Sequence, residues 1–206
     1  MRTSVISMIL AVVIISAAFG QEKRYGIESA IVKKNSVVKA QGMEQTLSSV
    51  QYFADYGAKE STEVTMNVMG QTLNIFSLMK DGYMYSANMS MGQGTKINLA
   101  SMEDYNVVNF LNLTDEVKQK YQIQANGVEE VLGKPCNRYE MSYTAQGQSV
   151  KGSVWVWQGL TLKSRINAAG NTVEEEVTEI QEGATIAGDK FELPSGINFI
   201  EMNLPM

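Results

Sequence analysis

The side chains that most enzymes use for chemistry are scarce in this sequence. None of the 206 residues is a histidine, and Cys136 is the sole cysteine. Nucleophile systems of the Ser-His-Asp or Cys-His type, and the usual zinc sites, therefore lack their parts. A single cysteine forms no disulfide within the chain, so Cys136 is either buried, which we favour, or paired between chains. We predict that the protein is not an enzyme and that it uses no cofactor and no metal ion.

The acidic run Glu174-Glu175-Glu176 is a candidate cation site. Successive side chains of a strand point to opposite faces, so three consecutive carboxylates converge on one ion only at a bulge. We interpret the run as part of a solvated strand whose charges discourage pairing with other chains. No two acids are singled out as a glycosidase-type pair.

Methionine stands out in the composition. The chain has 13 methionines, and many concentrate in its first half: Met66, Met69, Met79, Met84, Met89, Met91 and Met102. Three interpretations stay open. These side chains fill the core, or Met89-Ser90-Met91 belongs to a soft-metal site for monovalent copper, or they line an apolar cavity that accepts ligands of variable shape. An apolar ligand needs no polar motif, because burying about ten methylenes contributes roughly 8 kcal/mol.

The elements that position these side chains are short strands, of which residues 150–157 are the most informative. Val154 and Val156 face one side of this strand, and Trp155 and Trp157 face the other. Both faces are therefore apolar. In the next strand, over 160–167, the apolar residues share one face and the polar residues the other. A strand that is apolar on both faces beside one that is apolar on a single face predicts a curved sheet.

Period-two alternation and turn signals continue along the chain. Asp81-Gly82 is a strong hairpin signal. Helical spacing predicts a helix over 103–113, capped by Ser101 or Asp104, and a shorter helix over 114–121, capped by Thr114. We predict an α+β fold that is mainly antiparallel β, with about ten strands and one to three short helices packed in or over the mouth of the sheet. The expected strands include 24–34, 46–56, 63–69, 73–78, 83–89, 138–144, 150–157, 160–167, 172–177 and 189–194, with an edge strand in the tail.

The first twenty residues have the pattern of an export signal. Arg2 gives a positive start, residues 5–15 are almost wholly apolar, and Ala18 and Gly20 stand where a signal peptidase reads small residues. We predict a signal peptide over 1–20 and a single domain over 21–206, with no stable membrane span after cleavage. The formal net charge of −5 argues against nucleic acid as a partner, because phosphates need a basic stripe.

The C-terminal half resembles the LolA-like superfamily, which comprises the bacterial periplasmic outer-membrane lipoprotein carriers and their relatives. The resemblance rests on a tryptophan-bearing strand, a glycine turn, a strand ending in Leu-Lys, a second turn and a late Phe-x-x-Pro. In this chain those features are residues 154–163, Gly170-Asn171-Thr172-Val173 and Phe191-Glu192-Leu193-Pro194. The segments 132–139 and 52–57 look like the corresponding segments of uncharacterised relatives in this superfamily. Thr161 stands where the carriers usually have proline.

The resemblance implies a half-open antiparallel barrel around an apolar cavity, lidded by short helices, in a periplasmic protein. We therefore expect a non-enzymatic exported protein that binds a lipid, an acyl chain or a lipoprotein. An envelope structural or protein-interaction module with a packed core is the alternative, and a Met-rich soft-metal binder is a weaker one. The oligomeric state stays open. The residues expected to line the cavity are Met66, Val68, Ile75, Met84, Trp155, Trp157, Leu160 and Leu162.

Overall fold

The computed structural model of the protein describes residues 23–202, apart from residues 41, 69, 100–107 and 146. The predicted signal peptide over 1–20 and the predicted caps Ser101 and Asp104 lie outside the described residues, as do Met69 and Met102. In the described part of the chain, no helix has the length and apolar character that crossing a bilayer requires.

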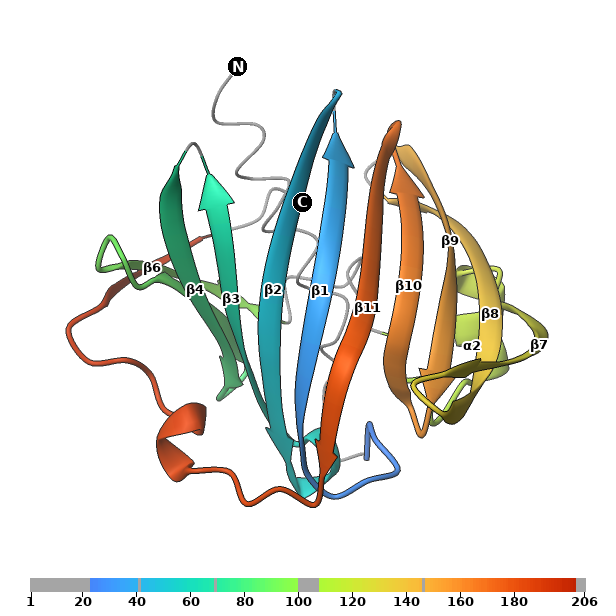
Figure 1. The fold of residues 1–206 in the computed structure, drawn as a ribbon, viewed down its shortest axis with the longest axis horizontal. Helices are drawn as coiled ribbons and strands as arrows, with labels where there is room; N and C mark the ends of the chain where they lie inside the picture. The colour runs from blue at the N-terminus through green and yellow to red at the C-terminus, as the bar shows by residue number, and fades with distance from the viewer. Residues whose placement is uncertain (1–22, 41, 69, 100–107, 146, 203–206) are drawn as a thin grey trace.

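A single sheet of twelve strands dominates the described structure (Figure 1). Its strands are β1 (Ala30–Ala40), β2 (Met43–Ala54), β3 (Lys59–Val68), β4 (Gln71–Lys80), β5 (Tyr83–Asn88), β6 (Gln93–Asn98), β7 (Gln124–Val131), β8 (Lys134–Ala145), β9 (Gln148–Trp157), β10 (Leu160–Ala168), β11 (Asn171–Glu182) and β12 (Asn198–Glu201). Figure 1 shows the strands strongly twisted and bent, with β6 and β8 on opposite sides of the central strands.

The order of strands follows from hairpins and two long-range pairings. The order is β12-β6-β5-β4-β3-β2-β1-β11-β10-β9-β8-β7, and every pair is antiparallel except β12 with β6. The pair of β1 with β11 joins the two meanders, and the pair of β12 with β6 adds the C-terminal strand to one edge. The predicted single, mainly antiparallel sheet is confirmed, with twelve strands in place of about ten. The sheet is open, because its end strands β7 and β12 do not pair with each other.

Local turn chemistry explains several of these elements. Asp81 and Gly82 both have positive φ, at 52° and 77°, as the predicted tight hairpin requires. The helix α2 (Asp115–Lys120) begins after Thr114, whose side chain accepts a hydrogen bond from the Val117 amide at 3.3 Å. The predicted cap of this short helix is therefore confirmed.

Three predicted elements differ from the structure. The first strand begins at Ala30 and not at residue 24, because the Arg24 and Tyr25 amides bond the Tyr56 carbonyl and hold residues 23–29 across the end of the sheet. The described part of the predicted helix over 103–113 is a turn, in which Asn109 accepts the Leu111 amide. The predicted strand over 189–194 is instead the 3₁₀ helix η4 (Gly188–Phe191) and an irregular segment.

The two faces of the sheet can be told apart by register, because directly paired residues lie on the same face. One row of such pairs crosses seven strands, from β3 through β2, β1, β11, β10 and β9 to β8. We call the face that carries this row the inner face and the opposite one the outer face. The row consists of Met66, Leu47, Ser36, Glu175, Ser164, Val154 and Tyr139.

Different segments cover different parts of the two faces. On the inner face, the segment that contains α2 packs over β8 and β9, where Val117 and Tyr121 join Val154 and Val156 in one apolar cluster. On the outer face, the C-terminal segment with η4 and β12 runs past β3 to β6 (Figure 1). There Lys190 bonds Glu63 at 2.6 Å.

Candidate functional site

The inner face of strands β1 to β4 carries an apolar cluster. Its members all come from strands of the same sheet. They are buried Val38, Leu47, Val64 and Met66, with partly buried Val68, Leu73, Ile75 and Val173 around them. Over β8 and β9, by contrast, a second segment packs on the sheet. The four buried members are 1% to 6% exposed, so the folded chain already shields them, and the apolar surface that stays accessible belongs to the partly buried members around them.

A polar centre lies beside this cluster on the inner face. The Lys34 ammonium lies 3.2 Å from the Glu175 carboxylate, and the Ser36 hydroxyl donates to the same carboxylate at 3.2 Å. Lys34 and Ser36 are mostly or fully buried. The mostly buried Lys34 charge therefore depends on Glu175 for its solvation, and the pair leaves this part of the inner face without net charge.

The acidic run divides between the two faces as its spacing predicts. Glu175 lies on the inner face with Lys34, whereas Glu174 and Glu176 lie on the outer face, near Arg165 at 3.0 Å and Lys163 at 3.7 Å. The described residues contain no group of three acidic, histidine or cysteine side chains that would hold a metal ion.

A buried network of hydrogen bonds joins the N-terminal segment to the inner face of β2 and β3. Arg24 pairs with Glu60, and the Tyr25 hydroxyl donates to the same Glu60 carboxylate at 2.9 Å. Burial raises the pKa of Tyr25 well above its ordinary value, and the nearby Glu60 charge raises it further. The tyrosine therefore stays protonated and acts as a donor.

Gln51 completes this network and leaves one atom unpaired. Its side-chain amide donates to the Tyr25 oxygen at 3.0 Å, and that direction follows because the Tyr25 proton is already given to Glu60. The Gln51 Oε1 atom must then be an acceptor. It is buried and has no hydrogen-bond partner in the described part of the chain.

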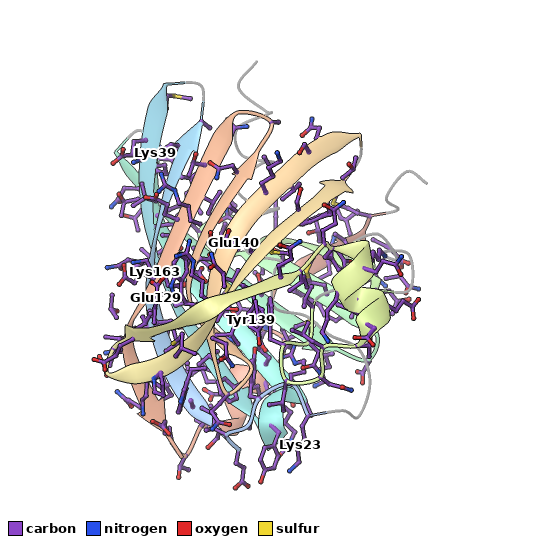
Figure 2. All side chains as sticks on the ribbon, turned by 90° about the vertical axis from the view of Figure 1, so that its right-hand side faces the viewer. Lys23, Lys39, Glu129, Tyr139, Glu140 and Lys163 are labelled. Atoms are coloured by element: carbon purple, nitrogen blue, oxygen red, sulfur yellow. The ribbon has the colours of Figure 1, made fainter. Side chains whose placement is uncertain are left out.

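The outer face of β7 to β10 is polar around one tryptophan. Trp155 is buried, and its indole N–H donates to the Glu129 carboxylate at 2.7 Å, while the Arg138 guanidinium lies 5.1 Å from the ring centre. The hydrogen bonds from Trp155 and Arg138 lower the pKa of Glu129. Figure 2 views this side of the molecule, with Glu129 and Lys163 labelled near one another. On this surface, ion-paired side chains cover the Trp155 ring.

The eight residues predicted to line a cavity do not share one surface. Met66, Val68 and Ile75 lie together in the inner-face cluster, and Met84 lies on the same face with Ile97 and Leu99. Trp155 and Trp157 lie on the outer face, opposite Val154 and Val156. Leu160 and Leu162 belong to one buried cluster with Trp155, against which Trp157 packs, and Leu162 lies at a bulge. The tryptophans therefore do not join the methionines, and the binding role of all eight remains a prediction.

Sequence reasoning missed the polar groups of the inner face. Lys34 and Gln51 lie in strands that we predicted, whereas Glu60 lies in β3 before the start of the predicted strand 63–69. Gln51 alternates with Leu47 and Phe53, and this spacing is the signal that could have placed it on the inward face. The partner Arg24 comes from the segment that we predicted as strand.

Comparison with known proteins finds similar solved structures at low sequence identity. No protein-family model and no curated protein matches the chain. Among solved structures, it is similar to a chain of the Pseudomonas aeruginosa MucA/MucB complex, with 14% identity, a TM-score of 0.48, and coverage of 86% of this chain and 60% of that one. In a second structure containing MucB it spans 56% of the matched chain.

Two further matches concern lipoproteins by their descriptions. One is a candidate outer membrane lipoprotein-sorting protein domain from Vibrio parahaemolyticus, with 10% identity, a TM-score of 0.40, and coverage of 84% of this chain and 91% of that one. The other is the Mycobacterium tuberculosis lipoprotein LppX, with 9% identity, a TM-score of 0.44, and coverage of 79% and 91%. Both are similarities at low sequence identity, and the function proposed below rests on this chain's own side chains.

Proposed function

We propose that this protein is a non-enzymatic, exported binding protein that holds an apolar or amphiphilic ligand, such as a lipid or an acyl chain, against the inner face of its sheet. The observation that carries the proposal is the apolar cluster of β1 to β4, whose members Val68, Leu73 and Ile75 are only partly buried and which lies beside the Lys34–Glu175 pair. An apolar chain would pack on the cluster, and each methylene removed from water would contribute about 0.8 kcal/mol.

Native mass spectrometry tests the ligand directly. Protein purified from a lysate that still contains membranes should carry one or more bound lipids, which organic extraction releases. A ligand-free mass in repeated preparations would remove the basis of the proposal. The same spectra give the mature mass, which should correspond to cleavage before Gln21 if the chain is exported through its predicted signal peptide.

A pair of variants on neighbouring positions locates the ligand. Leu73 is partly buried on the inner face, whereas Thr72 is exposed on the outer face of the same strand. Leu73→Asp should weaken binding of a fluorescent fatty acid about tenfold or more, because it removes apolar contact and places a charge where the chain would pack. Thr72→Asp, the matched control, should leave the affinity within about twofold. Equal effects of the two changes would place the ligand elsewhere.

A further inference from the structure

A row of polar side chains, four with a hydroxyl group and one with an amide, crosses the inner face of β2 to β6. Direct pairing in the sheet places each beside the next, so all five lie on the same face. Around them, Val64 and Ile75 form one apolar border, and Met79, Met84 and Ile97 form the other. We call these five residues the hydroxyl row. Its members are Gln51, Thr62, Ser77, Ser86 and Thr95.

The hydroxyl row has unused hydrogen-bonding capacity. Thr62, Ser77 and Ser86 are partly buried, as is Thr95, and no hydrogen bond from their side chains occurs within the described residues. At the β2 end, Gln51 is 1% exposed and its Oε1 acceptor is unpaired. A buried acceptor without a donor is destabilising, so this atom calls for an O–H or N–H group from a bound molecule.

The charges near the row are already neutralised. On one side Lys34 pairs with Glu175, and on the other Glu60 pairs with Arg24 and accepts from Tyr25. A ligand with a net charge would meet no free counter-charge among these four charged residues. Burying an unpaired ion is costly, so the row favours a neutral polar group.

Building on the proposed function, we propose that the hydroxyl row is a subsite for the neutral polar part of an amphiphile. The ligand class is an uncharged acyl lipid with at least one free hydroxyl or amide N–H and ester or amide carbonyls, of which a diacylglycerol is the simplest example. Its donor would meet Gln51 Oε1, its carbonyls would accept from Thr62, Ser77 or Ser86, and its chains would lie on the two apolar borders.

Ligand-side comparison tests this in the unaltered protein. The probes carry the same fluorescent acyl chain: a diacylglycerol, a hydrocarbon of equal length without oxygen, and phosphatidic acid. The diacylglycerol should bind about tenfold or more tightly than the phosphatidic acid, because the latter carries a charge that the row does not compensate. Tighter binding of phosphatidic acid would overturn the neutral ligand class.

A variant then tests the row itself. Thr62→Val combined with Ser77→Ala and Ser86→Ala removes three hydroxyls while keeping strand-compatible side chains. It should weaken diacylglycerol binding about tenfold or more and leave hydrocarbon binding within about twofold. Ser48→Ala combined with Thr144→Val removes exposed outer-face hydroxyls and should change neither affinity. If the triple variant does not fold, the single change Thr62→Val in the same assay should still weaken diacylglycerol binding more than hydrocarbon binding.

The outcomes separate the two proposals. Should the unaltered protein bind none of the probes, the proposed function itself fails. Should it bind diacylglycerol and hydrocarbon equally well, with the triple variant changing neither, the protein would remain an apolar-ligand binder and only the hydroxyl row would be discarded.

Discussion

Two buried oxygen atoms, one on each face of the sheet, are the unusual groups at the scale of single residues. Gln51 Oε1 lies on the inner face and Ser61 Oγ on the outer face, and neither has a partner in the described part of the chain. Their consequences differ. Gln51 belongs to a hydrogen-bond network with Tyr25 and Glu60 that fixes its orientation, so its unpaired Oε1 atom points in one direction. Ser61 has no such network and is explained by no function that we infer.

Ser61 therefore supports a stability prediction. Ser61→Ala removes a hydroxyl that is buried without a hydrogen bond, and the alanine fits the same space. We expect the free energy of unfolding to rise by about 1 kcal/mol, as measured by chemical denaturation. The matched control is Ser48→Ala, at an exposed position of β2, which should change stability by less than about 0.5 kcal/mol. A loss of stability in Ser61→Ala would show that the hydroxyl has a partner.

At the scale of elements, the C-terminal segment is attached by close packing more than by pairing. The strand β12 has four residues and pairs only with β6, in parallel. Phe199 packs edge-on against Tyr85, with ring centres 5.3 Å apart. Gly94 of β6 makes this possible, since a β-carbon there would lie 2.5 Å from the Phe199 ring and 2.9 Å from Ile197.

Gly94→Ala is therefore expected to loosen β12. Overpacking of this kind costs about 1–3 kcal/mol, and the cheapest response is for the four-residue edge strand to move away. Amide hydrogen exchange should accelerate over residues 198–202, including the Met202 amide that donates to the Lys96 carbonyl. Gly188→Ala is the control, because no atom lies within 4 Å of a β-carbon there. Unchanged protection in Gly94→Ala would show that Phe199 can shift without releasing the strand.

At the scale of the whole molecule, the two faces of the sheet are covered by different parts of the chain. The outer face is covered by the chain's own C-terminal segment over β3 to β6 and by ion pairs over β7 to β10. The inner face is covered by the segment with α2 over β8 and β9, and the apolar layer of β1 to β4 is where we propose the ligand.

This division predicts that stability depends on the ligand. A ligand that binds the folded chain alone raises the unfolding free energy by about 2.7 kcal/mol when its free concentration is a hundred times its dissociation constant. The melting temperature of delipidated protein should therefore rise when diacylglycerol is supplied in phosphatidylcholine vesicles. It should not rise with phosphatidylcholine vesicles alone. No shift at saturating diacylglycerol would contradict binding to the folded inner face.

Much of the architecture was predictable because strand alternation and turn chemistry are local. The Asp81-Gly82 hairpin, the Thr114 cap and the opposite facing of Val154 and Trp155 all follow from neighbouring residues, and all occur in the structure. The segments that were misassigned, 24–29 and 189–194, have alternating patterns but make their contacts with distant strands. Their alternation gave no sign that Arg24 would pair with Glu60 or that Lys190 would reach Glu63.

The sequence by itself determined that this chain lacks the parts of most catalytic sites, and that it folds as hairpins with one apolar side. The tertiary structure alone decided which side faces inward and which residues meet there. The reason is that a period of two separates the faces of a strand without naming them, whereas the pairing of β1 with β11 places Lys34 beside Glu175 across 141 positions of the chain. Pairing over that distance depends on how the two meanders meet in the folded chain, and no local pattern records it.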